Sequence, residues 1–169
     1  DLTGYRAIIR EPIRGTYRGE YGIISMPPPS SGGITLTMML NILEEYDLKK
    51  LGHNSSRTIH LMAEAMRRAY ADRAQYLGDI DFVEIPIGRL TSKEHAARHR
   101  MTIDPYHATR SEELGPELAL SPESNETSHY SVVDQYGNAV SNTYTLEGGY
   151  GSHIVITGTG FLTNNEMSD

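Results

Sequence analysis

The chain has 169 residues, and its 15 Lys and Arg against 22 Asp and Glu give a formal net charge of −7 at pH 7. An acidic chain without a basic cluster argues against a nucleic-acid partner. Cysteine is absent, which excludes disulfides, thiolate nucleophiles and cysteine-ligated zinc, and no uninterrupted apolar stretch is long enough to span a membrane. The length suits one domain with a sizeable core, and neither end resembles a natural terminus, so we expect an excerpt of a longer polypeptide.

The first part of the chain predicts one strand and one helix. Residues 16–26 alternate weakly and end at three consecutive prolines, which is typical of a strand that stops there. Residues 30–33, Ser-Ser-Gly-Gly, favour a helix entry with a cap and close packing over an anion site, because they match no full phosphate-loop pattern. The helix that follows is predicted to end near residues 46–48. Its apolar stripe consists of Leu36, Met39, Leu40 and Leu43.

The middle of the chain predicts two more helices. Residues 54–56 offer capping side chains for the start of the first of these helices, and Gly78 marks its predicted end. Its predicted apolar stripe consists of Ile59, Met62, Ala63, Met66 and Tyr70. Residues 91–100 predict a shorter helix that is capped by Thr91 or Ser92.

Two histidines of this shorter helix could share one face, because His95 and His99 are four residues apart. A metal ion would need a third ligand and supporting contacts, and the sequence between the two lacks the glutamate of a metalloprotease motif. A solvated helix face is therefore the favoured interpretation, and we predict no metal site.

The second half of the chain changes from helical to sheet-like. Residues 103–125 are rich in Pro, Ser, Glu and Asp, which predicts an exposed, mobile loop. Residues 130–133 and 139–144 then flank a turn that contains Asn and Gly, and this pattern predicts a hairpin. A short strand is predicted at residues 154–156.

Thr127 stands where the polar loop gives way to the hairpin. A threonine hydroxyl is a poor nucleophile unless a base takes its proton, and an N-terminal threonine supplies its own α-amine, with an unperturbed pKa of about 7.7–8.0. Such a residue must be exposed by cutting the bond before it, and the hydroxyl itself can attack the Glu126 carbonyl to do so. By pattern alone, the first residue of an ordinary strand is the favoured interpretation, because β-branched residues suit strands. His129 shares the face of Thr127 on an ideal strand, and we favour a structural role for it.

A series of specific motifs runs along the chain. Residues 127–134, Thr-Ser-His-Tyr-Ser-Val-Val-Asp, are followed by Gly-Asn-Ala-Val, Thr-Tyr-Thr-Leu and Asn-Asn-Glu-Met. These motifs resemble the start of the small subunit of γ-glutamyltranspeptidases. Residues 26–33 (Met-Pro-Pro-Pro-Ser-Ser-Gly-Gly) and 69–73 (Ala-Tyr-Ala-Asp-Arg) resemble the end of the large subunit. The resemblance covers essentially the whole chain in the expected order.

This resemblance implies an α+β fold, namely part of the αββα sandwich of N-terminal nucleophile (Ntn) hydrolases. Residues 1–126 would be the C-terminal part of the large-subunit region and residues 127–169 the N-terminal part of the small-subunit region, both in one incomplete domain and from one precursor. The implied activity is the transfer of a γ-glutamyl group from glutathione or another γ-glutamyl amide to water, an amino acid or a dipeptide. No cofactor is implied, and relatives of this kind are typically periplasmic, secreted or at the cell surface.

The resemblance also assigns roles to individual residues. Thr127 matches the nucleophile, the Glu126–Thr127 bond matches the self-cleavage site, and Thr145 matches a second threonine that orients the first. Glu147, Glu166 and Asp169 match positions that hold the α-amino group of the glutamyl moiety, and carboxylates suit an ammonium group. Without the resemblance, these three would be interpreted as solvated loop residues.

Two features leave alternatives open. Glu147 stands where many relatives have Asn, so the charge of the pocket is not fixed by the resemblance. The family's oxyanion-hole glycines and its carboxylate-binding arginine lie outside this sequence, and one lost oxyanion donor costs about 10²–10³ in rate, so we expect the excerpt alone to be inactive. The alternatives are a related acylase that acts on a β-lactam side chain or on poly-γ-glutamate, and a homologue that neither cleaves nor catalyses.

Overall fold

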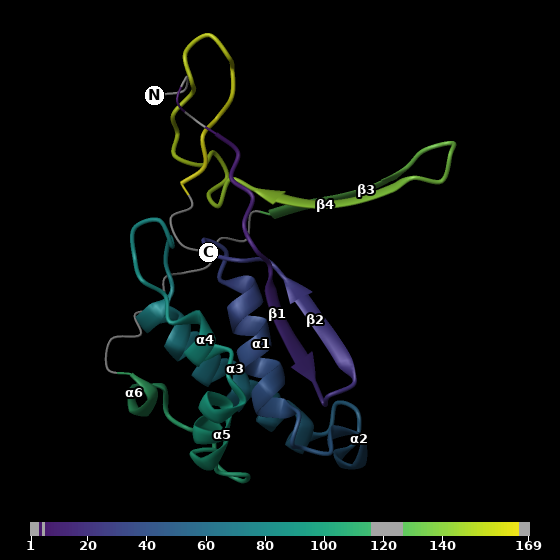
Figure 1. Ribbon diagram of the computed structural model, residues 1–169, viewed down its shortest axis with the longest axis vertical. Coiled ribbons are helices and arrows are strands. Elements are labelled where there is room, and N and C mark those ends of the chain that lie inside the picture. Colours follow the sequence, from purple (N-terminus) through teal and green to yellow (C-terminus); the bar gives the residue numbers. More distant parts are fainter. Residues whose placement is uncertain (1–3, 5, 116–126, 166–169) are drawn as a thin grey trace. The chain divides into compact units, whose positions relative to one another are not determined.

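The computed structural model describes residues 4, 6–115 and 127–165, which fall into two compact units on either side of residues 116–126. The N-terminal unit contains β1 Ile13–Tyr17, β2 Tyr21–Ser25, α1 Gly32–Leu43, α2 Leu48–Leu51, α3 Ser56–Tyr76, α4 Ile87–Leu90, α5 Lys93–Met101 and α6 Ser111–Leu114 (Figure 1). The C-terminal unit contains β3 Thr127–Val133 and β4 Ala139–Thr145. None of the helices in the described ranges is long and apolar enough to cross a membrane.

The described strands form two separate antiparallel pairs, β1 with β2 and β3 with β4. The mixture of helices and strands agrees with the predicted α+β class. Two separate two-stranded sheets do not establish the αββα sandwich, which stays a prediction.

The single strand predicted at residues 16–26 is wrong, because the chain turns back inside it to form the β1–β2 hairpin. Arg18 and Gly19 have φ values of 53° and 68°, and left-handed values at both central positions are what a type I′ turn requires. The Arg18 N–H donates to Glu44 Oε2 at 3.0 Å, and its guanidinium donates to Tyr46 O at 2.6 Å. These long-range bonds hold an arginine in a conformation that its own sequence does not signal.

The core of the N-terminal unit joins α1, α3 and the β1–β2 hairpin. Its buried hydrophobic side chains are Ile13, Ile34, Met38, Ala69, Ile85 and Leu90. A Cβ on Gly33, in the first turn of α1, would collide with the carbonyl oxygen of Met26. This close approach confirms the tight packing predicted at residues 30–33. Ser31 makes no side-chain cap and instead accepts a hydrogen bond from Arg73 Nε at 3.0 Å. Ser30 Oγ accepts the N–H of Gly32 at 3.3 Å, so within the predicted segment this serine binds a backbone donor of the first turn.

The apolar stripe predicted for α3 is wrong, and the stripe predicted for α1 is offset from the buried face. The large members of the stripe predicted for α3, Ile59, Met62, Met66 and Tyr70, are between 40% and 54% exposed. The face of α3 that is buried instead carries Thr58, Leu61, Glu64, Ala65, Arg68, Ala69 and Asp72. In α1, Ile34, Met38 and Ile42 are buried, whereas Leu36 of the predicted stripe is exposed. Both faces of α3 contain apolar residues, so periodicity alone does not select the buried one.

Serine caps begin α3 and α5 where they were predicted. Ser55 Oγ accepts the N–H of Thr58 at 3.2 Å, and Ser92 Oγ accepts the N–H of His95 at 3.1 Å. Each bond satisfies a backbone donor that has no partner inside its helix. The prediction of both helix starts is therefore confirmed.

The first part of the predicted mobile loop is anchored to α3 by a buried ion pair. Arg68 Nη1 lies 2.6 Å from Glu64 Oε2, and both side chains are at most 1% exposed. The N–H and the hydroxyl of Thr109 donate to Glu64 at 3.0 and 2.6 Å, and Arg68 Nη2 donates to Thr102 O at 2.7 Å. Thr109 is thus held by side chains of α3, which the prediction of a mobile loop did not anticipate, whereas residues 104–108 and 110–113 are exposed as predicted. The rest of the loop lies outside the described residues.

The C-terminal unit contains the predicted hairpin. In its turn, the N–H of Asp134 donates to Asn138 O at 3.0 Å. The short strand predicted at 154–156 is wrong, since within the described ranges Val155 makes only an isolated bridge to Leu162. The hairpin is therefore the one regular element of the described C-terminal unit.

Candidate functional site

The two threonines predicted to act together are partners across the β3–β4 hairpin. Thr127 is the first residue of β3, Thr145 is the last residue of β4, and the register pairs them directly. Side chains of directly opposite residues point to the same face, with Cβ atoms about 4.5–5.5 Å apart. Thr127 is exposed and Thr145 is half-buried. The hairpin thus brings together two residues that are distant in the sequence, at its open end.

A turn follows Thr145 and carries Glu147. The N–H of Glu147 donates to Thr145 Oγ1 at 2.8 Å. Glu147 has a φ of 69°, an uncommon value for a residue with a side chain. The hydroxyl of Thr145 therefore fixes the start of the loop that holds the predicted substrate-binding carboxylate.

Asn165 ties this loop to a later part of the chain. Its Nδ2 donates to Glu147 Oε2, its Oδ1 accepts the N–H of Gly148 at 3.0 Å, and its N–H donates to Leu146 O at 3.2 Å. Sequence reasoning did not single out Asn165, although it belongs to the motif Asn-Asn-Glu-Met and precedes Glu166. Membership of that motif was the signal that could have identified it.

Three predicted site residues lie outside the described part of the chain. These are Glu126 of the expected cleavage site and two of the expected ammonium-binding carboxylates, Glu166 and Asp169. Their positions relative to Thr127 and Glu147 therefore stay predictions.

The face of the hairpin that carries Thr127 is lined by hydroxyls and one histidine. His129 Nδ1 lies 2.8 Å from Thr143 Oγ1, and its Nε2 lies 3.3 and 3.2 Å from Ser131 Oγ and Ser141 Oγ. The contacts with Thr143 and Ser141 cross between the strands, which agrees with the structural role favoured for His129. The opposite face is mainly apolar and carries Tyr130, Val132, Val140 and Tyr144, each about half exposed, beside Ser128 and Asn142. An isolated two-stranded hairpin is marginally stable, so this apolar face is where we expect further packing.

The predicted solvated face of α5 is wrong at its two histidines. Their side chains are only 12% and 21% exposed for His95 and His99, and both Nε2 atoms contact the carboxylate of Asp72 in α3. Among the described residues, these three form a group of potential metal ligands. The third ligand comes from a different helix, so local spacing could not reveal it.

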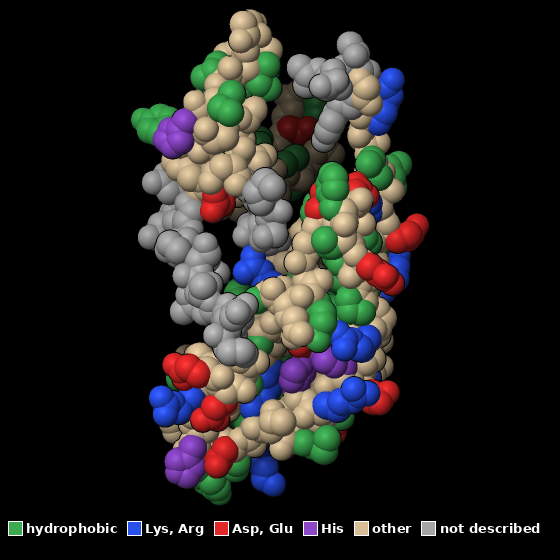
Figure 2. All heavy atoms as spheres, turned by 90° about the vertical axis from the view of Figure 1, so that its left-hand side faces the viewer, with side chains coloured by type: hydrophobic (Ala, Val, Ile, Leu, Met, Phe, Trp, Pro, Cys, Tyr) green, Lys and Arg blue, Asp and Glu red, His purple; other side chains and the backbone are tan. Residues whose placement is uncertain are grey.

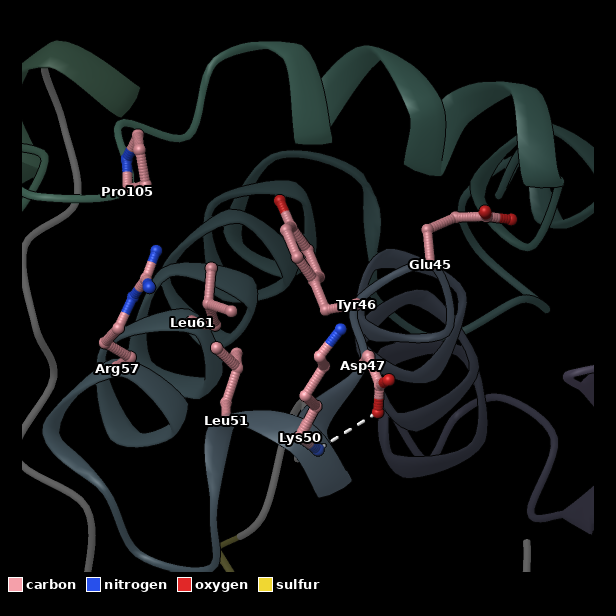
Figure 3. A pocket seen from close by; sticks show the side chains of 8 residues that line it. All are labelled: Glu45, Tyr46, Asp47, Lys50, Leu51, Arg57, Leu61 and Pro105. Atoms are coloured by element: carbon pink, nitrogen blue, oxygen red, sulfur yellow. Dashed lines mark hydrogen bonds between the residues drawn. The ribbon is translucent and has the colours of Figure 1, made fainter.

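A small cavity of about 240 Å³ lies in the N-terminal unit beside α2 and α3 (Figure 3). Its lining includes Tyr46, Lys50, Leu51, Arg57 and Leu61, and Lys50 is bound through its N–H to Asp47 Oδ1 at 3.1 Å. It contains none of the predicted site residues. Its lining lacks a nucleophile paired with a base, so it does not define a catalytic site.

Comparison with known sequences gives consistent matches over the whole chain. A family model described as Gamma-glutamyltranspeptidase matches residues 1–169. The chain is 51% identical over 169 residues to the glutathione hydrolase proenzyme of Escherichia coli (strain K12), which covers 100% of this chain and 29% of that protein. It is 47% identical over 167 residues to the Acylase ACY 1 proenzyme of Pseudomonas sp. (strain SE83), and this match covers 99% of this chain and 29% of that protein. The chain therefore spans less than a third of the length of these curated relatives.

Solved structures give the same grouping. The γ-glutamyltranspeptidase of Helicobacter pylori is similar with a TM-score of 0.66 and 46% identity, over 74% of this chain and 36% of that one. A cephalosporin acylase from Bacillus halodurans is similar with a TM-score of 0.68 and 26% identity, over 97% of this chain and 28% of that one.

Proposed function

Because the chain belongs to the γ-glutamyltranspeptidase family, we propose that it is part of an enzyme that transfers or hydrolyses γ-glutamyl groups through an ester on Thr127. The observation that carries the proposal is the pairing of Thr127 with Thr145 at the open end of the β3–β4 hairpin. The proposal concerns the whole protein, of which this chain would supply the nucleophile and part of the glutamyl pocket.

The cut that exposes Thr127 would fall at the Glu126–Thr127 bond. Thr127 Oγ attacks the Glu126 carbonyl, the acyl group moves from nitrogen to oxygen, and water hydrolyses the ester. Support comes from the position of Thr127 as the first residue of a seven-residue strand, because the ladder with β4 would hold the new terminus after the cut. Residues 1–126 and 127–169 would then belong to the large and small subunits of one Ntn-hydrolase domain with the αββα sandwich.

The freed α-amine of Thr127 would act as the base in the mature enzyme. It takes the proton of the Thr127 hydroxyl as Oγ attacks the γ-carbonyl of the donor, and it returns that proton to the departing amine. The γ-glutamyl ester that remains is then attacked by water or by the amine of an acceptor. In this proposal, Thr145 orients the amino end of Thr127, which its position across the hairpin supports.

The α-amino group of the glutamyl moiety would be held by Glu147 together with Glu166 and Asp169. Support comes from the loop of Glu147, which is fixed at one end by Thr145 Oγ1 and at the other by Asn165. A carboxylate so positioned favours a donor that carries an ammonium group. By family resemblance, the enzyme acts outside the cytoplasm and needs no cofactor.

Intact mass and N-terminal sequencing of the purified full-length protein test this proposal. A fragment that begins Thr-Ser-His-Tyr, absent from a Thr127→Ala variant, is the expected result. A full-length Thr127→Ala protein that still splits at this bond would overturn the role of Thr127, and an uncut parent protein would favour the non-catalytic homologue.

A second candidate function is that of an acylase, favoured by the 47% identity to the Acylase ACY 1 proenzyme and by the likeness to a cephalosporin acylase. The two functions differ in whether the acyl group carries an α-amine. Paired assays with γ-glutamyl and glutaryl anilides separate them. Faster release from the γ-glutamyl compound supports the proposal, whereas faster release from the glutaryl compound supports the acylase.

A further inference from the structure

Three side chains of the N-terminal unit converge on one point between α3 and α5. Asp72 Oδ2 lies 2.6 Å from His95 Nε2 and 2.8 Å from His99 Nε2, and the two Nε2 atoms are 3.1 Å apart. The rings meet edge to face, with centroids 4.6 Å apart. Two imidazoles that aim the same nitrogen at one carboxylate oxygen form an arrangement that a cation at this point would stabilise.

Local structure on both helices fixes this convergence. His95 and His99 are one turn apart on α5, and the cap from Ser92 to the His95 N–H sets the start of that helix. Ala96, between the two histidines, is 2% exposed and packs in a core cluster with Ile42 and Ala65. This packing fixes the orientation of α5 against α1 and α3, so His95 and His99 are held facing the neighbouring helices.

We propose that Asp72, His95 and His99 bind a zinc ion through Asp72 Oδ2 and the two Nε2 atoms, and that the ion links α3 to α5. Two imidazoles and one carboxylate are borderline donors that suit Zn²⁺, whereas Mg²⁺ prefers oxygen ligands alone. Three protein ligands leave a fourth position for water or another small ligand. The proposal is independent of the role proposed for Thr127.

The spacing of the three donor atoms is close to that of a zinc site. Tetrahedral Zn²⁺ with bonds of about 2.0–2.1 Å holds its ligand atoms about 3.3 Å apart. The three observed separations are somewhat shorter, so the ion would spread the side chains by less than about 1 Å. That movement is within the reach of side-chain rotation and needs no change in either helix.

The charges around the group also permit a cation. Arg68 donates to the backbone oxygen of His99 at 3.2 Å, but its charge is paired with the buried Glu64 at 2.6 Å. The side chain of His99 reaches the surface at 21% exposure, which gives an ion a route of entry. Histidine side chains are visible at the surface of the helical part, among lysine and arginine side chains (Figure 2).

Metal titration of the full-length protein tests this inference. After treatment with a chelator, the parent protein is titrated with Zn²⁺ by calorimetry and with Co²⁺ by visible absorption. We expect one zinc site and the d–d bands of four-coordinate Co²⁺ in the parent, and no such site for Mg²⁺. His95→Gln, His99→Gln and Asp72→Asn should each weaken that site at least about 100-fold, because loss of outer contacts alone costs 10–100-fold.

His107→Gln is the matched control. His107 also faces a carboxylate, Asp104, at 3.2 Å, but its side chain is 83% exposed, and among the described residues it belongs to no group of three potential metal ligands. This variant should bind zinc as the parent does. Zinc affinity that is unchanged in His95→Gln and His99→Gln, or a parent protein without Co²⁺ bands, would overturn the proposal.

A readout on the parent protein covers the case in which a variant fails to fold. In histidine-labelled protein, Zn²⁺ should shift the Nε2 resonances of His95 and His99 but not those of His107. Unchanged resonances for both would refute the site and leave a purely structural hydrogen-bonded group.

Discussion

Thr127 and Thr145 face each other at the open end of the β3–β4 hairpin, as the terminal pair of its register. The Thr145 hydroxyl also accepts the N–H of Glu147 at 2.8 Å. One side chain thus lies between the proposed nucleophile and the loop that would hold the substrate. This arrangement means that a change at Thr145 should affect both the cut and the turnover of substrate.

Replacing Thr145 by valine should slow self-cleavage and lower kcat/KM of the mature enzyme by about 10–100-fold. Valine keeps the shape and the strand preference of threonine but removes the hydroxyl, and a hydrogen bond lost at a buried or charged group costs about 1–3 kcal/mol. Thr145→Ser should retain much of the activity. Ser128→Ala, on the opposite face of the hairpin, is the control. Cleavage and turnover of Thr145→Val at the parent's rates would contradict the role of Thr145.

Replacing Asn165 by alanine should raise KM for γ-glutamyl substrates by about 10-fold or more. The change removes the amide that donates to Glu147 and the acceptor for the N–H of Gly148, which frees the loop that carries the carboxylate. A hydrogen bond to a charged group is worth about 1.5–3 kcal/mol. Steady-state kinetics with a γ-glutamyl anilide measure the effect, with Asn142→Ala on β4 as the control. Equal KM values for Asn165→Ala and the control would show that Asn165 does not position Glu147.

The sequence predicted the features that depend on neighbouring residues. Capping serines at 55 and 92 each satisfy a donor three residues away, and the turn of the second hairpin needs only Asn and Gly at the correct spacing. The partial site at Thr127 and Thr145 also follows from the hairpin, because the length of its turn sets which residues pair. The roles of these threonines, however, came from the family resemblance and not from their spacing.

The features that sequence reasoning missed depend on contacts between distant residues. Arg18 adopts a left-handed turn because Glu44 and Tyr46 bind it, which no local pattern indicates. The buried face of α3 can carry charged side chains because groups from beyond residue 90 form hydrogen bonds and ion pairs with them. Periodicity measures only the apolar residues of a helix, so it selected the wrong face of α3.

Removing the positive charge of the buried ion pair should destabilise the N-terminal unit strongly. Arg68→Met removes the cation that lies 2.6 Å from the buried Glu64 and leaves Arg67, at 3.9 Å, as its remaining ion-pair partner. Breaking a buried pair costs about 3–5 kcal/mol. Arg98 and Glu94 on α5 have the same four-residue spacing, but their side chains are 61% and 78% exposed. Arg98→Met should therefore cost less than about 0.5 kcal/mol, as exposed helix pairs do. The unfolding free energies of the two full-length variants are compared by urea denaturation. Hydrogen exchange of the α3 amides then shows whether the loss lies in the N-terminal unit.

If Arg68→Met and Arg98→Met lowered the free energy of unfolding equally, burial would not set the strength of the Glu64–Arg68 pair. The double change Glu64→Leu with Arg68→Met is a further check, because it removes both charges from the interior. It should be more stable than Arg68→Met alone, since no unpaired carboxylate remains. A double variant that is less stable would contradict this account.

The same carboxylate should make stability depend on pH in the acid range. Burial raises the pKa of Glu64, but hydrogen bonds from Thr109 and Arg68 and the charge of Arg68 lower it more, so the folded-state pKa lies below 4.5. Because the unfolded chain then takes up the proton first, the stabilisation is present above about pH 4.5 and is lost as the pH falls towards the folded-state pKa. Uptake of one proton on unfolding changes the free energy of unfolding by about 1.4 kcal/mol per pH unit. In the acid range, Glu64→Gln should therefore reduce the slope of unfolding free energy against pH by up to that amount. Glu94→Gln, at an exposed pair, should leave the limb unchanged. Denaturation measured at a series of pH values from neutral to acid tests this, and parallel acid limbs for the parent and Glu64→Gln would contradict it.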